Sequence, residues 1–376
     1  MIYELLFPLS EQFGWAGVLN VLRYTPFRAI MSVLTAMMLS FFLAPWFIRT
    51  LRGKQIKQII REEGPKSHFS KAGTPTMGGA LILLCCLLPT VLWADVKNTF
   101  VLATTAVTAG YGIIGYLDDR LKIVGKNTRG LPGRYKILGQ VLIGGVALYY
   151  LYVHDGGLPE GWLAIRHRLS LPFVAFSKLP IELPAWAYVL FGLFVLVGTS
   201  NSVNLTDGLD GLAIGPVMIA SGTYLVWAYV AGSVLFGFPL AGYLDIAGVP
   251  AMAELSVFAA AVIGAGIGFL WYNTYPAQVF MGDVGSLSLG GGLGMLALLT
   301  KNEFLSVILG GIFVLEGASV ITQVVSFKLF KKRVFLMAPI HHHYEQKGWP
   351  EPRIIVRFWI ISLLLALVAL SSIKVR

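Results

Sequence analysis

The stretch from which both the fold and the site can be argued reads Gln278-Val279-Phe280-Met281-Gly282-Asp283-Val284-Gly285-Ser286. It places one carboxylate, Asp283, between two glycines at the start of an apolar segment. A charged group in such a position is costly to desolvate unless it binds a partner. We therefore expect Asp283 to hold a metal ion, and we expect the other polar loops of the chain to converge on it.

The composition is that of a polytopic membrane protein. Of the 376 residues, 56% are hydrophobic and 13% are charged, whereas soluble domains carry about 25% charged residues. The net charge of +10 need not indicate nucleic acid, because membrane proteins concentrate Lys and Arg in cytoplasmic loops. We expect no nucleic-acid partner. The adjacent Cys85 and Cys86 cannot reach disulfide geometry within a helix, so we expect packing roles for both.

Ten segments are candidates to cross a bilayer, which takes roughly 20 apolar residues. All of them should be helical, because lipid cannot satisfy free backbone groups. The predicted fold class is therefore all-α, with about ten transmembrane helices in a single domain that covers residues 1–376. The segments are 29–48, 77–94, 99–117, 137–153, 184–199, 212–236, 255–272, 284–300, 304–327 and 358–373.

The distribution of cations predicts the orientation of these spans. Loops that follow odd-numbered spans hold 20 of the Lys and Arg residues, and the opposite side holds 9. The positive-inside rule places the first group in the cytoplasm and both termini in the periplasm. The main acids fall on the cytoplasmic side, so we expect the active site to be formed by loops 49–76, 118–136, 200–211, 273–283 and 328–357.

The first of these loops ends in hydroxyl, Lys and Gly residues that include Lys71 and Thr76. Free backbone N–H groups at a helix start favour an anion, although a capped helix start with a positive-inside lysine explains the same residues and is the reading favoured by the loop alone. The nucleotide-binding patterns GxxxxGK[ST] and GxGxxG followed by an acid are absent from this loop.

The second loop begins with Asp118 and Asp119, which close the third span. Adjacent carboxylates repel, so one of them is expected to retain its proton more tightly, as a base or metal ligand would. In a helix they point about 100° apart, which suggests different roles. A solvated pair neutralised by Arg120 and Lys122 is an equally weighted alternative. A group of basic residues suited to phosphates follows, and consists of Lys126, Arg129, Arg134 and Lys136.

The loop at 200–211 is polar but contains neither Lys nor Arg. Asp207 and Asp210 are three residues apart and are expected to share a helix face. Helix capping explains one such residue but not six polar ones, so we favour a polar ligand that also involves Asn204. In the next loop, Asn273 precedes Asp283 and belongs to the same set.

The last loop carries three consecutive histidines, His341, His342 and His343. Consecutive side chains diverge, so the three cannot all bind one ion tightly. We favour one or two of them as hydrogen-bond donors to phosphate or sugar. Glu316 lies in the middle of the ninth span, with Gln323 two turns on; an acid there is a functional candidate by default, and a buried structural hydrogen bond is an equal alternative.

Together these loops combine several carboxylates with basic residues and hydroxyls. Carboxylates without a Cys/His set indicate a hard ion with oxygen ligands. Mg²⁺ takes one or two carboxylates and completes its coordination with water and substrate phosphates. We therefore expect a metal-dependent phosphoryl transfer at the cytoplasmic membrane surface, between one soluble and one lipid-borne substrate.

Four blocks of the sequence carry a resemblance to a known family: GYLDD at 115–119, NLTDGLDG at 204–211, FMGDVGS at 280–286 and PIHHHYE at 339–345. In this order they resemble the signature blocks of the polyprenyl-phosphate sugar-1-phosphate transferase superfamily, and the resemblance covers the whole chain. The histidine block, with Gly348-Trp349-Pro350-Glu351, resembles the bacterial phospho-N-acetylmuramoyl-pentapeptide-transferase family in particular.

This resemblance implies transfer of phospho-MurNAc-pentapeptide from UDP-MurNAc-pentapeptide to undecaprenyl phosphate, in the bacterial inner membrane, by a homodimer. UMP and lipid I would be the products. It implies Mg²⁺ on Asp283 and a base at Asp118 or Asp119. The substrate-binding residues that it implies are Lys71, Thr76, Lys136, Asn204, Asp207, Asp210, Asn273, His341, His342 and His343.

Three questions stay open on the sequence. A sister enzyme that uses UDP-GlcNAc is the near alternative, and the histidine triplet argues against it. An ion-coupled transporter is the alternative from another class, although transporter sites lie near the bilayer midplane and these acids, except Glu316, lie at helix ends. The transfer could also proceed in one direct step or through a covalent phosphate on Asp283.

Overall fold

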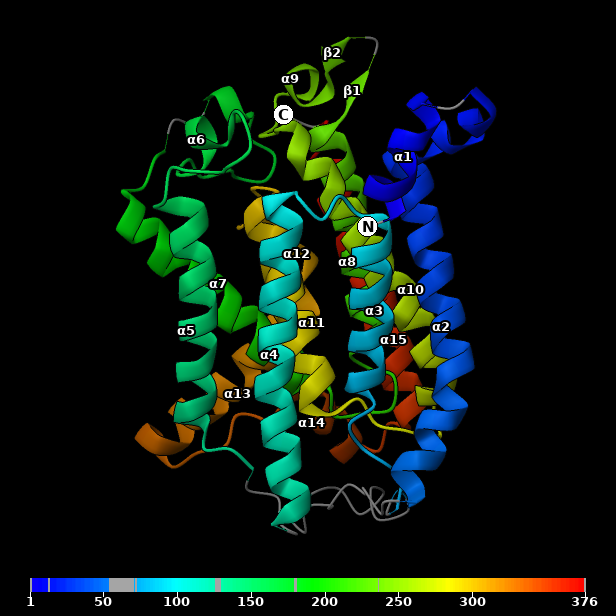
Figure 1. The fold of residues 1–376 in the computed structure, drawn as a ribbon. Coiled ribbons are helices and arrows are strands. Elements are labelled where there is room, and N and C mark those ends of the chain that lie inside the picture. The colour runs from blue at the N-terminus through cyan, green and yellow to red at the C-terminus, as the bar shows by residue number, and fades with distance from the viewer. Residues whose placement is uncertain are drawn as a thin grey trace.

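The computed structural model describes residues 2–12, 14–53, 71, 73–125, 130–178, 181–235 and 237–374. These residues form a bundle of long helices (Figure 1), which confirms the predicted all-α fold class. The described strands are the two short ones of a hairpin, β1 (Val234–Leu235) and β2 (Phe238–Pro239). The long helices are α2 (Thr25–Gly53), α3 (Gly79–Trp93), α4 (Thr99–Val124), α5 (Gly133–Tyr152), α7 (Ala185–Thr206), α8 (Ile214–Gly232), α10 (Leu255–Asn273), α11 (Gly282–Leu299), α13 (Gly311–Phe330) and α15 (Glu351–Ser371).

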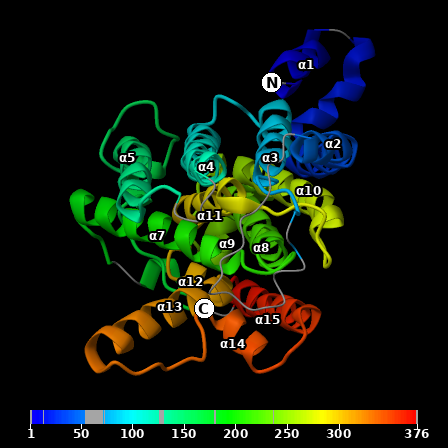
Figure 2. The same ribbon diagram turned by 90° about the horizontal axis from the view of Figure 1, so that it is seen from below.

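Nine of the ten predicted spans each coincide with one of these helices. Among the described residues, eight helices are long and apolar enough to cross a membrane, and α3 is a shorter apolar helix. The ninth span differs from the prediction because it breaks at Gly310 into α12 (Leu305–Leu309) and α13. A Cβ at Gly310 would lie 2.8 Å from the carbonyl oxygen of Ser306, so the break occurs where a side chain would crowd the turn. Beyond it, α13 leans away from the bundle (Figures 1 and 2).

Helix α11, which begins at the opening stretch, lies in the middle of the bundle (Figure 2). It packs against α4 and α7, and all of its residues from Val284 to Leu299 are buried. Its glycines make this possible: a Cβ at Gly290 would lie 2.6 Å from Cα of Ser200, and a Cβ at Gly79 of α3 would lie 2.0 Å from the nitrogen of Gly285. The Gly-rich sequence therefore allows three helices to approach the helix that carries Asp283.

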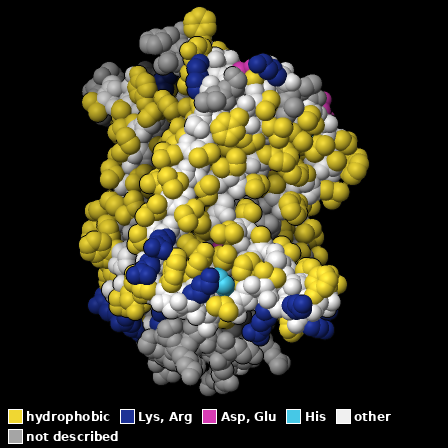
Figure 3. All heavy atoms as spheres, turned by 180° about the vertical axis from the view of Figure 1, so that it is seen from behind, with side chains coloured by type: hydrophobic (Ala, Val, Ile, Leu, Met, Phe, Trp, Pro, Cys, Tyr) yellow, Lys and Arg dark blue, Asp and Glu magenta, His cyan; other side chains and the backbone are white. Residues whose placement is uncertain are grey.

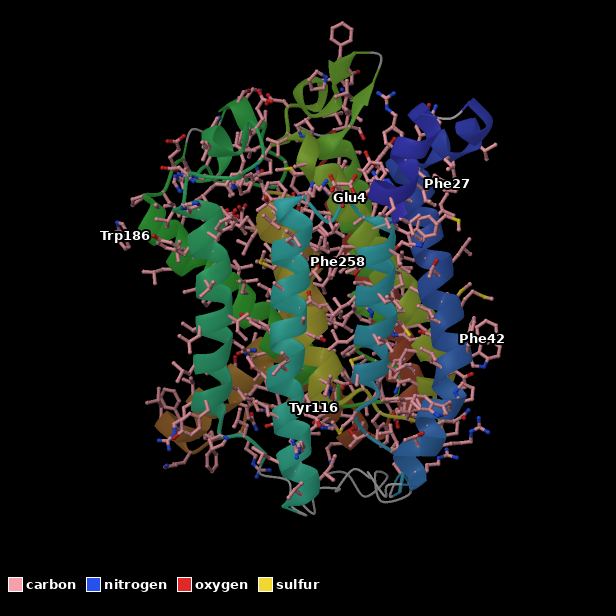
Figure 4. All side chains as sticks on the ribbon, viewed as in Figure 1. Glu4, Phe27, Phe42, Tyr116, Trp186 and Phe258 are labelled. Atoms are coloured by element: carbon pink, nitrogen blue, oxygen red, sulfur yellow. The ribbon has the colours of Figure 1, made fainter. Side chains whose placement is uncertain are left out.

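The outer surface of the bundle is apolar over its middle. Phe42 and Trp186 point outward and are 72% and 68% exposed, whereas Phe258 lies inside the bundle (Figure 4). Hydrophobic side chains cover the middle of the molecule, and Lys and Arg gather mainly toward one end (Figure 3). An apolar surface of this extent is stable in lipid rather than in water, which agrees with a multi-pass membrane protein. Cys85 and Cys86 are both free and buried between helices.

Short elements cover the end of the bundle where the two ends of the chain lie (Figure 1). Two of them, at the N-terminus, were not anticipated, because the sequence before residue 25 has neither the length nor the hydropathy of a span. These elements are α1 (Ile2–Gln12), η1 (Gly14–Arg23), α6 (Trp162–Ile165), η3 (Phe176–Lys178), α9 (Leu240–Leu244) and η4 (Pro250–Glu254).

One local prediction is wrong. Asp207 and Asp210 do not share a helix face, because α7 ends at Thr206 and α8 begins at Ile214, with turns between them. Gly211, with φ +76°, takes a left-handed conformation that a continuous helix would not contain. The two carboxylates consequently reach different partners.

Candidate active site

The three acids Asp118, Asp119 and Asp283 meet at the end of the bundle opposite the chain termini. Each offers one carboxylate oxygen, and these oxygens lie within 4.8 Å of one another. Asp118 and Asp119 lie near the end of α4, and Asp283 lies in the first turn of α11. The side chains of Asp118 and Asp119 are 0% and 4% exposed, so the alternative of a solvated pair does not describe them.

Two lysines bridge these acids. Nζ of Lys136 lies 2.6 Å from Oδ2 of Asp283 and 3.0 Å from Oδ1 of Asp118. Nζ of Lys122 pairs with Asp118, lies 3.1 Å from Oδ1 of Asp283, and lies 3.6 Å from Oδ1 of Asp119. Three carboxylates therefore face two ammonium groups, and the cluster has room in its charge balance for a further cation. Lys122, which the sequence suggested only as a neutralising residue, is a central member of this cluster.

The backbone brings the acids together. A Cβ at Gly115 would lie 2.2 Å from the carbonyl oxygen of Asp283, so only glycine allows α4 to contact α11 at this level. Gly282 has φ +72°, and a Cβ there would lie 2.6 Å from Oδ2 of Asp119. The amide of Val284 donates to the same Oδ2 at 3.2 Å. Gly115 and Gly282 thus allow the end of α4 and the start of α11 to touch, which brings Asp118 and Asp119 to Asp283.

The segment that leads into α3 packs against the residues that precede Asp283. The amides of Gly78 and Gly79 donate to the carbonyls of Phe280 and Met281, both at 2.8 Å. These two amides are therefore occupied by carbonyl groups of the protein. They do not offer the anion site that free N–H groups at this helix start would form. Thr76 is buried, and its Oγ1 would lie 3.1 Å from a Cβ at Gly282, which places it beside the acid cluster.

A second ionic cluster lies on the same end and holds the 207–211 turn. Nζ of Lys71 lies 2.7 Å from Oδ1 of Asp210 and 2.6 Å from Oε1 of Glu351. Asp210 also accepts from the amide of Ala277 at 2.9 Å, and its own amide donates to Glu351 at 2.9 Å. Lys71 and Asp210 are thus joined, as members of one site should be. Glu351 was not among the predicted site residues, because an acid in the first turn of a helix is an ordinary feature.

The other polar residues of the turn region point toward the same loop. Nδ2 of Asn204 donates to Oγ of Ser286 at 2.7 Å, and Nδ2 of Asn273 donates to the carbonyl of Val279 at 2.8 Å. Oδ1 of Asn273 is buried without a hydrogen-bond partner among the described residues. An unsatisfied buried acceptor costs about 1–3 kcal/mol, so this atom is a candidate ligand contact.

Asp207 lies on the side of the turn that faces the acid cluster. Desolvation, followed by the charges of Asp283 and Asp119, raises the pKa of Asp207 to about 8, and a backbone hydrogen bond from Gly282 acts in the opposite direction. A bound cation or a nucleotide with its counterion would relieve this repulsion. After desolvation, the charges of Asp283 and Asp119 are thus the main influence on the carboxyl group of Asp207.

The histidine triplet opens the short helix α14 (Ile340–Gln346), and its members take different environments, as predicted. His341 is buried and pairs with Glu316, while His342 pairs with Glu345. His343 accepts a hydrogen bond from the amide of Leu336 at 3.1 Å and so supports its own loop. Burial and the nearby Lys347 lower the pKa of His343.

The predicted basic group is only partly described. Lys126, Arg129 and residues 54–70 lie outside the described residues. Arg134 stacks on the ring of Tyr135, 4.9 Å from its centroid, and does not join the acid cluster. Lys136, two residues further along the same helix, does join it.

The donor set of the cluster fits a divalent hard cation. Its oxygens come from carboxylates, which suit Mg²⁺ better than softer metals. The side chain of Asp283 keeps 13% of its surface exposed, so an ion and its waters have access to it from the loop side. Asp283 is accordingly the acid of the three with the most room for a ligand.

Comparisons with known proteins extend over the same regions. A family model described as Glycosyl transferase family 4 matches residues 101–301, and phospho-N-acetylmuramoyl-pentapeptide-transferase signature 1 matches residues 71–83. The phospho-N-acetylmuramoyl-pentapeptide-transferase of Sorangium cellulosum (strain So ce56) is 70% identical over 376 residues, which is 100% of both chains. The chain belongs to the phospho-N-acetylmuramoyl-pentapeptide-transferase family.

Other members of the phospho-N-acetylmuramoyl-pentapeptide-transferase family match over the full length as well. The protein of that name from Geobacter sp. (strain M21) is 52% identical over 377 residues, and the one from Anaeromyxobacter sp. (strain Fw109-5) is 54% identical over 386 residues. Both matches cover 100% of this chain and of the relative. The family resemblance inferred from the four sequence blocks is thereby confirmed.

Proposed function

We propose that this protein transfers phospho-N-acetylmuramoyl-pentapeptide from UDP-MurNAc-pentapeptide to undecaprenyl phosphate, which yields lipid I and UMP. The observation that carries the proposal is the buried cluster of Asp118, Asp119 and Asp283, bridged by Lys122 and Lys136 at one end of an apolar bundle. Such a cluster can bind the two phosphates of a nucleotide donor beside the phosphate of an acceptor that stays in the lipid.

Asp283 is the proposed ligand of Mg²⁺, with Asp118 or Asp119 close enough to share it. When bound, Mg²⁺ would neutralise the pyrophosphate and stabilise the departing UMP. Lys122 and Lys136 would move from the carboxylates to the phosphate oxygens, because ammonium groups bind phosphate as point charges. One of the two α4 carboxylates would accept a proton from the lipid phosphate.

The 207–211 turn is the proposed nucleotide side of the site. Lys71 and Glu351 fix Asp210, so the turn stays in place before the nucleotide arrives. Asn204, Asp207 and Asn273 line its inner side with amide and carboxyl groups, and these can bind the base, the ribose hydroxyls and the phosphates. These groups come from the loops at 49–76, 118–136, 200–211 and 273–283. Together with α14 and the helices of the bundle, these loops form one catalytic domain.

We further propose a homodimer in the bacterial inner membrane, with the acid cluster facing the cytoplasm and both termini in the periplasm. The excess of Lys and Arg in the loops at the cluster end supports this orientation. Labelling of single cysteines introduced at exposed Asp155 and exposed Arg134, with a reagent that cannot cross the membrane, tests it in intact cells. Labelling at position 134 from outside would contradict the orientation.

The function is tested by UMP release from purified protein in detergent. We expect release only when UDP-MurNAc-pentapeptide, undecaprenyl phosphate and Mg²⁺ are all present, and loss of release with EDTA that excess Mg²⁺ restores. UDP-GlcNAc in place of the muramoyl donor should give little UMP. Release that persists with EDTA would refute the metal dependence, and a preference for UDP-GlcNAc would refute the substrate.

A further inference from the structure

Glu316 is a buried acid within the membrane-spanning helix α13, and its partner is a histidine. Its Oε1 lies 3.0 Å from Nδ1 of His341. The side chains of Glu316 and His341 are 0% and 1% exposed. Since α13 leans out of the bundle after Gly310, this contact ties it to α14, which carries the histidine triplet. From the sequence, Glu316 could be functional or structural. Its contact with His341, a predicted substrate-binding residue, favours a functional role.

The pair leaves two atoms without partners. Oε2 of Glu316 and Nε2 of His341 are buried and make no hydrogen bond among the described residues. Nε2 of His341 faces the 207–211 turn, since a Cβ at Gly208 would lie 2.2 Å from it. A glycine at this position therefore leaves Nε2 directed at the turn with no side chain between them. An unpaired buried nitrogen is destabilising unless a ligand or the turn itself supplies its partner.

The neighbouring histidine repeats the arrangement. Nδ1 of His342 lies 2.6 Å from Oε2 of Glu345, and the rings of His341 and His342 are 4.1 Å apart between centroids. In both cases a carboxylate holds Nδ1, which fixes the orientation of the ring. Of the two, His341 is the one whose Nε2 makes no hydrogen bond among the described residues. His343, whose Nδ1 accepts from a backbone amide instead, does not share this pattern.

We propose that Glu316 is a positioning residue for the nucleotide donor. It accepts the Nδ1–H of His341 and thereby aims Nε2 at the 207–211 turn, where Nε2 donates to a phosphate oxygen of the bound donor. Such an arrangement uses both ring nitrogens as donors, Nδ1–H to Glu316 and Nε2–H to the phosphate. This inference rests on the proposed function in its choice of ligand, a nucleoside diphosphate.

The test compares Glu316→Gln, His341→Ala and the double variant of the full-length protein in detergent. UDP affinity is measured by titration calorimetry, and kcat and KM are measured for each substrate separately. We expect Glu316→Gln to weaken UDP binding and lower kcat/KM for the nucleotide donor about ten- to hundredfold, as for loss of a charge-assisted hydrogen bond. KM for undecaprenyl phosphate should stay within about twofold of the wild-type value.

The double variant separates positioning from a structural role. If Glu316 acts through His341, Glu316→Gln adds no further loss on the His341→Ala background. Independent losses that multiply in the double variant would overturn the proposal, as would unchanged UDP affinity in Glu316→Gln. Ser319→Ala is the matched control, because Ser319 is buried one turn further along α13 and donates to the carbonyl of Glu316 at 2.7 Å. It should bind UDP as the wild type does.

A variant on the opposite side keeps the proposal testable if Glu316→Gln does not fold. Gly208→Ala places a methyl group against Nε2 of His341, so it should weaken UDP binding to a similar degree. Wild-type UDP affinity in Gly208→Ala would overturn the proposal. UDP binding is measured without the acceptor lipid, so these results stand apart from any failure of the wild-type protein to release UMP.

Discussion

The two ends of the bundle each bury an ionic cluster, and the clusters differ in charge balance and in access. At one end, Asp118, Asp119 and Asp283 face two lysines, and the lysines and Asp283 keep part of their surface exposed. At the other end, Lys301 pairs with Glu303 at 2.8 Å, and both side chains are 0% exposed.

The far cluster is closed by its neighbours. Lys301 donates to the carbonyl of Arg166 at 3.0 Å and to the hydroxyl of Tyr188, which in turn donates to Glu303. The ammonium also lies 4.2 Å from the centre of the Tyr188 ring. One cation meets one anion, and Tyr188 covers both. Burial alone therefore does not mark a functional site; an excess of one charge and an opening toward solvent do.

Replacing Asp283 by Asn should have the largest effect, because it removes the proposed metal ligand. We expect transfer to fall by about 10⁴-fold, a typical cost of losing an essential catalytic carboxylate. The thermal unfolding temperature should fall only modestly, because Lys122 and Lys136 lose Asp283 as a charged partner but keep Asp118. UMP release and unfolding in detergent measure both quantities.

Asp155→Asn is the control for this variant, because Asp155 is an exposed acid at the other end that pairs with Arg166. It should transfer at the wild-type rate. Residual activity of Asp283→Asn above about a tenth of wild type would break the distinction between the two ends.

Replacing Lys301 by Met should act on stability instead. It leaves Glu303 buried without its cation, which costs about 3–5 kcal/mol of unfolding free energy. Adding Glu303→Leu should recover a large part of that loss, because the pair is then replaced by apolar groups. The transfer rate per folded molecule should match the wild type; a specific loss of rate with unchanged stability would show that the far cluster also serves catalysis.

Replacing Lys136 by Gln should have an intermediate effect on activity. The variant loses an ammonium that contacts Asp283 and Asp118 and is proposed to bind phosphate, and we expect kcat/KM to fall about ten- to hundredfold. Arg134→Gln is the matched control, since Arg134 lies two residues away on the same helix but stacks on Tyr135. Equal losses in the two variants would mean that only the general positive charge of the loop matters.

The smallest effect concerns pH. Because the pKa of Asp207 is raised to about 8, the folded state retains a proton that the unfolded state releases above about pH 4. Its contribution to stability therefore falls as pH rises from about 4 toward 8. In EDTA, Asp207→Asn should unfold at a temperature that falls less between pH 5 and pH 8 than the wild type does, by about 2–4 °C. An identical pH dependence in both proteins would contradict the raised pKa.

Much of the fold could be predicted because a bilayer allows few solutions. Apolar length located the long helices, since a segment that crosses lipid must be a helix. The break at Gly310 and the N-terminal helices escaped prediction, because they depend on tertiary packing rather than on hydropathy. Likewise, the i, i+3 spacing of Asp207 and Asp210 suggested a shared helix face, but the left-handed Gly211 ends that possibility.

The site was partly predictable for a related reason. Acids at helix ends on one side of a membrane stand out in the sequence, and Asp118, Asp119 and Asp283 do meet in space. Lys122 and Glu351 were missed as site members because a lysine near a span end and an acid in a first helical turn have ordinary explanations. Only the fold shows that each bridges loops distant in sequence.

The most direct test of the metal account is Mn²⁺ binding, measured by electron paramagnetic resonance on purified protein, with Mn²⁺ in place of Mg²⁺. We expect the wild type and Lys301→Met to bind Mn²⁺ with similar affinity, and Asp283→Asn to lose that binding. Undiminished Mn²⁺ binding by Asp283→Asn would contradict the assignment of the acid cluster as the metal site.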